Sequence, residues 1–97
     1  MRNPRLKPSQ CELCERQIGL TFHHLIPRKV HRRPRFKKHY DAEALNRGVW
    51  VCRGCHKAIH RFHNEMELAL SFNRLDTLKD SERLTAHIQW QKRQRIQ

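Results

Sequence analysis

Two pairs of cysteines constrain this chain more than any other feature of its sequence. Cys11 and Cys14 form one C-x-x-C pair, and Cys52 and Cys55 form the other. A two-residue gap lets both sulfurs of a pair reach one ion at about 2.3 Å, so the pairs predict a tetrahedral, four-thiolate zinc site. Such a closed site has no open position, so we expect a structural zinc. Two redox pairs or unrelated buried cysteines are the alternatives.

The separation of the pairs carries further information. Residues 15–51, a stretch of 37 residues, lie between them, whereas zinc sites of this type usually have a gap of about 15–20 residues. The longer gap indicates that a substantial element is inserted between the two halves of the site.

The length of 97 residues fits one domain, 1–97, with a basic arm at 1–9, a core at 10–63 and a helical tail at 64–97. The apolar fraction of 37% is low for a globular domain. A core this small needs an additional cross-link, and the zinc would supply it. We find no secretory signal and no membrane-spanning run, so we expect a cytoplasmic protein whose thiols stay reduced.

The charge points to nucleic acid, most simply double-stranded DNA, as the partner. Lys and Arg number 21 against 9 Asp and Glu, for a net charge of +12, which is typical of polyanion-binding domains. No basic helix has the apolar face that membrane insertion requires. Seven cations crowd the segment 28–39, which is predicted to be either a phosphate-contacting loop or a solvated one: Arg28, Lys29, Arg32, Arg33, Arg35, Lys37 and Lys38. Phe36 within it would stack on a base or pack on the core.

The hydrophobic pattern predicts an α+β fold. Short strands are expected at 21–26 and 49–51, one helical turn at 41–45 and a helix at 54–63. Asn64 is expected to cap a further helix, with Glu67 placed three residues on. Buried positions of the tail would be Leu68, Phe72 and Leu75, followed by Leu84, Ile88 and Trp90 on a last helix at 80–94.

Histidines provide a second candidate metal site. His56 and His60 are four residues apart, so both imidazoles lie on one helix face and can share an ion. Neighbouring helical residues point about 100° apart, so Cys55 and His56 should serve different ions. A residue of the first strand would complete the set, and His63 is an alternative to His60. Neutral imidazoles suit Zn, Ni, Mn or Co, and a remaining histidine would accept a proton from water.

At these residues the sequence resembles the HNH endonuclease family, also called ββα-metal or His-Me finger nucleases, in its small stand-alone bacterial form. The resemblance spans about residues 11–63 and consists of Cys11-x-x-Cys14, Phe22-His23-His24-Leu25-Ile26-Pro27, Asn46, Cys52-Arg-Gly-Cys55-His56 and His60. It implies a zinc-stapled, treble-clef-like ββα-metal core with a helical tail.

The resemblance also implies roles for individual residues. His24 would be the general base, His23, His56 and His60 would hold a catalytic divalent metal (Mg²⁺, Mn²⁺, Ni²⁺ or Zn²⁺), and Asn46 would fix the loop that aims the base. The products would be a 3′-hydroxyl and a 5′-phosphate.

This chain departs from the common family pattern in ways that bear on those roles. Many members have Asp before the base, where this chain has His23. The resemblance therefore does not fix which catalytic metal is preferred. Asn46 stands six residues before Cys52, so its register is open too. Side chains alternate along a strand, so His23 and His24 can serve one site only where the strand is distorted or ends.

The function expected from the sequence is a metal-dependent DNA endonuclease that nicks or cleaves with weak sequence preference. The alternatives are a non-catalytic zinc module that binds nucleic acid and a toxin-like RNase of the same fold. The first alternative accounts for the cysteines and the charge, but it does not explain the positions of the histidines.

Overall fold

The structure, a computed structural model, describes residues 7–94 and has the α+β fold expected from the sequence. It contains a two-stranded sheet, six α-helices and one 3₁₀-helix. In chain order these are β1 (Leu20–His24), η1 (Arg28–Val30), α1 (Pro34–His39), α2 (Ala42–Leu45), β2 (Gly48–Cys52), α3 (Arg53–Phe62), α4 (Glu65–Ser71), α5 (Leu75–Lys79) and α6 (Glu82–Lys92). The predicted arm at 1–9 lies mostly outside the described residues. No helix among residues 7–94 is long and apolar enough to cross a membrane.

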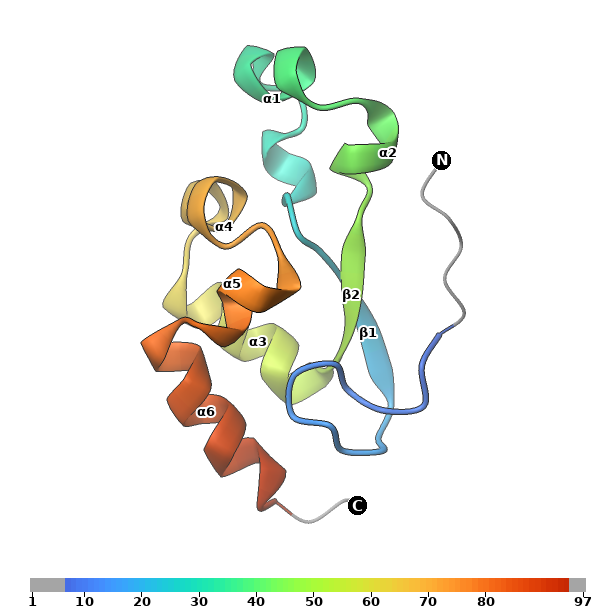
Figure 1. Cartoon of the computed structure of the whole chain (residues 1–97), viewed down its shortest axis with the longest axis vertical. Helices are drawn as coiled ribbons and strands as arrows, with labels where there is room; N and C mark the ends of the chain where they lie inside the picture. The colour runs from blue at the N-terminus through green and yellow to red at the C-terminus, as the bar shows by residue number, and fades with distance from the viewer. Residues whose placement is uncertain (1–6, 95–97) are drawn as a thin grey trace.

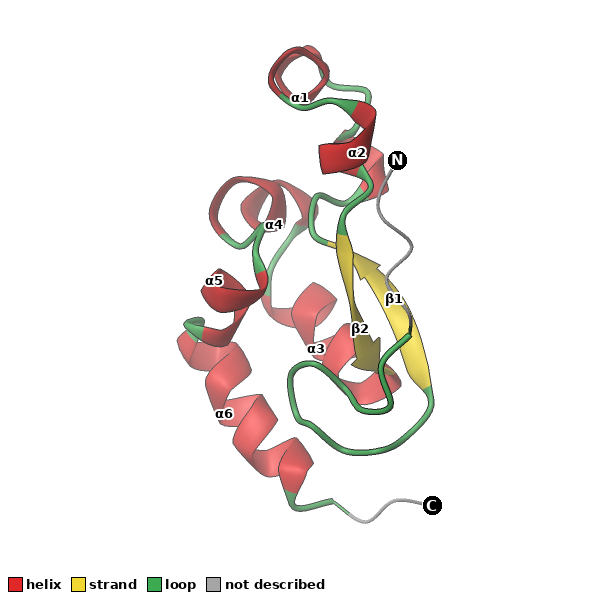
Figure 2. Ribbon diagram, turned by 45° about the vertical axis from the view of Figure 1, so that its right-hand side comes forward, coloured by secondary structure: helices red, strands yellow, loops and turns green. Residues whose placement is uncertain are grey.

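Helix α3 is the central element of the fold. It contacts both strands of the sheet on one side and α6 on the other. Figure 1 shows this arrangement, with the two strands to the right, α6 to the lower left and the loop that precedes β1 curving past the start of α3. Figure 2 shows α1 and α2 set apart at one end of the molecule. Residues on different faces of α3 therefore meet different parts of the structure.

The sheet is an antiparallel pair whose register places its histidines opposite the start of β2. His23 pairs with Val49 and His24 with Gly48. Gly48 is fully enclosed: a Cβ there would collide with the His23 carbonyl oxygen and the Phe22 ring. Only glycine allows β2 to begin so close to β1, and this approach sets where the two histidines lie.

Two apolar clusters form the core. The larger one joins the cysteines to β2, α3 and the tail helices and includes Val49, Val51, Ala58, Ile59, Leu68, Leu78, Leu84 and Ile88. The smaller one consists of Ile26, Val30, Phe36 and Ala69, with Tyr40, Leu45 and Met66 packed against it. Phe36 is only 1% exposed and its ring stacks on that of Tyr40. Of the two roles considered for Phe36, the structure supports packing on the core.

Helix caps explain where several elements begin. The Asp41 carboxylate accepts a hydrogen bond from the Ala44 amide at 2.8 Å, and the Asn64 side chain accepts one from the Glu67 amide at 2.8 Å. These side chains satisfy amides that the first turn of a helix leaves unpaired. The predicted cap at Asn64 is confirmed.

Other predictions about local structure were wrong. The basic segment 28–39 is not a plain loop, because η1 and α1 lie in it and Pro34 starts α1, a position that proline suits. Leu75 belongs to a separate helix, α5, which the pattern did not separate from its neighbours. Trp90 is 55% exposed, whereas Leu84 and Ile88 are buried as predicted.

Gly48→Ala should destabilise the protein by about 1–3 kcal/mol, because the added methyl must displace backbone or a packed ring. Gly19→Ala is the matched control, since a Cβ at Gly19 meets nothing within 4 Å. Urea unfolding of both variants at the same metal load measures the difference. Equal unfolding midpoints for the two variants would contradict the close approach at Gly48.

Candidate metal centres

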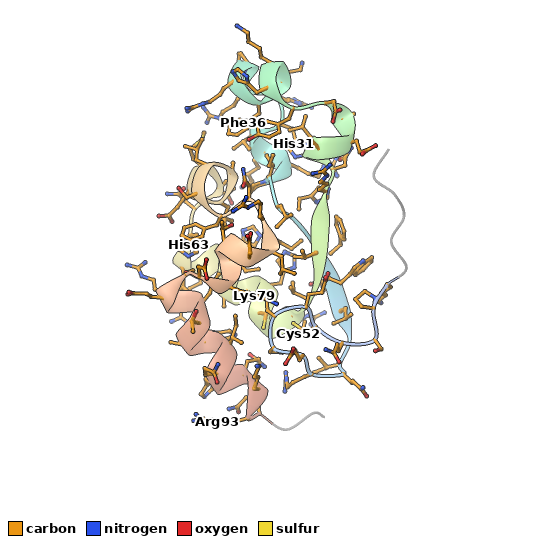
Figure 3. The ribbon with its side chains drawn as sticks, viewed as in Figure 1. His31, Phe36, Cys52, His63, Lys79 and Arg93 are labelled. Atoms are coloured by element: carbon orange, nitrogen blue, oxygen red, sulfur yellow. The ribbon has the colours of Figure 1, made fainter. Side chains whose placement is uncertain are left out.

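The four cysteines lie together in the core. Their sulfur atoms are all within 4.8 Å of one another, and all four residues are buried with free thiols. The Sγ atoms of Cys14 and Cys52 are 3.8 Å apart. Figure 3 shows Cys52 at the end of β2, next to the loop that precedes β1. The predicted pairing of two distant C-x-x-C motifs at one point is confirmed.

Backbone amides point at two of these sulfurs. The amides of Leu13 and Cys14 each lie 3.4 Å from Cys11 Sγ, and the Cys55 amide lies 3.5 Å from Cys52 Sγ, which caps α3. N–H donors stabilise negative charge on sulfur. One sulfur of each pair is therefore placed where negative charge on it is stabilised.

The protonation of the cluster shows why it suits a cation. Hydrogen bonds from the Cys52 and Cys55 thiols hold the pKa of Cys11 well below its usual range. Contacts with the Cys11 and Cys52 sulfurs raise the pKa of Cys55, and burial raises that of Cys14. Four buried thiolates cannot coexist uncompensated, so without an ion they share protons. A metal ion that displaces those protons would satisfy all four, and the residues present fit one.

The first cysteine pair is held in its turn by contacts with β2. Glu12 donates its amide to the Trp50 carbonyl at 2.9 Å, and its carboxylate accepts from the Trp50 amide at 2.7 Å. Glu15 closes the turn with φ of 67°, a left-handed conformation that costs a non-glycine residue energy. The turn is therefore fastened to the strand that ends at Cys52.

The second cluster consists of His23 from β1 and His56 and His60 from α3. One ring nitrogen of each lies within 4.8 Å of the others, and the ring centroids are 5.2–5.3 Å apart. His23 and His56 are separated by 32 residues (24–55) in the sequence. The fold thus brings β1 and one face of α3 together at three imidazoles. The structure brings together the three histidines that the sequence analysis grouped.

His23 is the most informative residue of this cluster. It is 1% exposed, yet neither ring nitrogen has a hydrogen-bond partner among the described residues. Burial, helped by His56 and His60, lowers the pKa of His23 to about 3, so the ring is neutral at neutral pH. A buried polar group without a partner is costly. A metal ion at the cluster would use the lone pair that is otherwise unsatisfied.

Thr21 orients His56. The Thr21 hydroxyl lies 3.0 Å from the Val51 carbonyl and 2.8 Å from His56 Nδ1. When it donates its one proton to the carbonyl, it accepts from His56 Nδ1–H, and the lone pair of His56 is then on Nε2. Burial lowers the pKa of His56 as well. Hydrogen bonds of this kind fix the tautomer of metal-binding histidines.

His24 lies beside the cluster at the last residue of β1. With His23, His56 and His60 it lines a pocket of about 240 Å³, which also includes Arg28, Lys29 and Glu65. Two successive residues reach one pocket because the strand ends at His24. The His24 ring packs edge-on against Phe22 at 5.1 Å and lies 5.9 Å from the ring of His31, whose Nε2 donates to the Ile26 carbonyl.

The remaining predicted residues lie outside the histidine cluster. Asn46 is exposed at the end of α2, where its amide donates to the Ala42 carbonyl at 2.9 Å. His63 is buried elsewhere, because its ring nitrogens pair with Glu67 and Ser81, and the alternative that placed it in the metal set was wrong. The seven cations of 28–38 are all exposed, and among them Arg28 and Lys29 reach the pocket.

Sequence reasoning missed three contributors to this site. Thr21 stands two residues before His23, so the period of a strand places both on one face, and this signal was available. Glu65 and His31 enter from α4 and from just after η1. Only the tertiary fold brings Glu65 to the pocket and His31 to the side of the His24 ring, and no spacing in the sequence indicates it.

Comparison with known proteins adds one relative. The chain is 29% identical over 85 residues to the uncharacterized protein YisB of Bacillus subtilis (strain 168), an alignment that covers 87% of this chain and 74% of that protein. No protein-family profile matches the chain, and no solved structure matches it.

Thr21→Val should weaken the binding of a divalent ion by the histidine cluster about 10–100-fold, because His56 loses the acceptor that fixes its tautomer. Thr85→Val is the matched control, since the Thr85 hydroxyl also donates to a backbone carbonyl, that of Lys79, at 2.8 Å. Calorimetric titration with Mn²⁺ or Ni²⁺ measures both variants. Equal affinities would show that Thr21 does not orient a metal ligand.

Proposed function

We propose that this chain is a divalent-metal-dependent endonuclease of the HNH type, acting on DNA, with a structural zinc on its four cysteines. The observation that carries the proposal is His23, a fully buried, neutral imidazole with both nitrogens unpartnered, which faces His56 and His60 across a gap suited to an ion. The order strand, strand, helix, with cysteines before β1 and at the β2–α3 junction, supports a ββα-metal, treble-clef-like core.

The two clusters have different roles in this proposal, one structural and one catalytic. The cysteine set offers four sulfur donors and no open position, which fits zinc in a structural role. The histidine set offers three nitrogen donors at the edge of an open pocket, which leaves positions for water and substrate. A divalent ion held there supplies Lewis acidity that offsets the charge developing on the scissile phosphate and on the leaving 3′ oxygen.

In this proposal His24 is the general base. It lines the pocket with the three other histidines and accepts a proton from the attacking water as the water oxygen bonds to phosphorus. The bond from phosphorus to the 3′ oxygen breaks, and that oxygen leaves as a hydroxyl after taking a proton from solvent. The products are a 3′-hydroxyl and a 5′-phosphate.

Surrounding residues support the base and the substrate. The packing of the His24 ring against Phe22 restricts its orientation, and His31 flanks it from the loop after η1. Arg28 and Lys29 at the mouth of the pocket attract the phosphate backbone. The Asn46 contact with Ala42 stabilises the end of α2, two residues before β2 begins, which is consistent with an orienting role through the loop.

His24→Ala should reduce nicking of supercoiled plasmid at least about 100-fold, the usual contribution of a general base. The assay uses Mg²⁺, Mn²⁺ and Ni²⁺ in turn. His39→Ala is the control, because His39 is exposed at the end of α1 and lines neither the pocket nor the cluster.

The outcomes separate the candidate functions. Equal nicking by wild type and His24→Ala would remove His24 as the base. No nicking by the wild type with any of the three metals, with plasmid binding intact, would favour the non-catalytic nucleic-acid-binding module.

A further inference from the structure

The outer face of α3 carries a row of cations that the functional site described above does not include. Arg53, Lys57 and Arg61 are four residues apart and all exposed. At 1.5 Å per residue the row extends over about 12 Å of helix. It runs alongside the row formed by His56 and His60 on the same helix, so the cations and the histidines share one edge of α3.

These side chains line an open groove of about 620 Å³, together with Thr21, His56 and His60. Its lining holds three cations and no carboxylate. His56 and His60 also line the smaller pocket that contains His23 and His24. The groove and the pocket therefore meet at these two histidines.

The three cations are available to an external anion. The ion pairs among residues 7–94 involve His63, Arg74 and Lys92 as the basic partners, and none involves the groove. Excess positive charge on an open concave surface attracts a polyanion, and this attraction weakens as the salt concentration rises. On the other side of the histidines, the pocket has its own cations, Arg28 and Lys29.

We propose that this groove binds the phosphate backbone of duplex DNA, so that one strand follows α3 and crosses the histidine cluster between two groups of cations. The part of this inference that leads the strand toward His24 rests on the proposed function. Measured along the duplex axis, a 12 Å row spans about three to four phosphates of one strand, at about 3.4 Å of axis per nucleotide. The basic segment 28–38 then contacts the backbone on one side of the reacting phosphate only.

The test measures binding rather than cleavage. Fluorescence anisotropy of a labelled duplex is recorded over a range of salt concentrations, with the zinc-loaded full chain carrying His24→Ala so that the duplex stays intact. The triple variant Arg53→Gln/Lys57→Gln/Arg61→Gln should lower the magnitude of the slope of log affinity against log salt by about 3, since each phosphate contact contributes about 0.9. Lys57→Gln alone should lower it by about 1.

A charge-matched control separates the groove from general attraction. Lys79→Gln/Lys92→Gln/Arg93→Gln removes the same charge from exposed residues that line neither the groove nor the pocket, and Figure 3 shows Lys79 and Arg93 on the tail helices. The control should lower the magnitude of the slope by less than about 1. Thermal unfolding confirms that each variant is folded.

Equal slopes for the groove variant and the control would overturn the proposal, as would a parent chain that binds duplex without salt dependence. Because cleavage is not read out, a chain that binds through the groove but never nicks plasmid would refute the nuclease and leave the groove standing. A chain that nicks plasmid but shows equal slopes would refute DNA binding by the groove and leave the proposed nuclease activity intact.

Discussion

The cluster of four buried sulfurs is the constraint on which the rest of the structure depends. Cys52 is at once the last residue of β2 and the N-cap of α3, so whatever holds its sulfur fixes the angle between strand and helix. Cys11 and Cys14 add the N-terminal turn, which Glu12 fastens to the middle of β2. In a chain with a thin apolar core, a shared ion at this point would replace packing that the sequence cannot supply.

The geometry of the histidine cluster depends on the junction between β2 and α3. Cys55 and His56 are successive residues, so α3 buries a sulfur on one face and turns an imidazole to the next. The close approach at Gly48 then helps to bring His23 and His24 beside His56 and His60, and the Thr21 hydroxyl lies 2.8 Å from His56 Nδ1. The two sites share one short segment of backbone, and a change in the first should therefore alter the second.

Local sequence predicted the features that depend on spacing and missed those that depend on tertiary contacts. The C-x-x-C pairs, the i, i+4 histidines and the Asn64 cap each lie within a few residues, where helix and turn geometry decides the outcome. The exposure of Trp90 and the break between α4 and α5 depend on how the tail meets α3, which no local pattern encodes. The same reason explains why Glu65 lines the pocket and His31 lies beside His24, whereas Thr21 was predictable from strand alternation.

We propose that this one short chain holds two chemically different metal sites, and an optical titration of the reduced, metal-free chain with Co²⁺ tests the proposal most directly. Thiolate-bound Co²⁺ absorbs strongly through sulfur-to-metal charge transfer, whereas Co²⁺ on imidazole and water shows only weak d–d bands. We predict that the charge-transfer absorption saturates at about one equivalent and that weak bands then grow to about two. His56→Ala/His60→Ala should remove only the second phase. A second phase that survives this substitution, or charge transfer that never develops, would contradict the account.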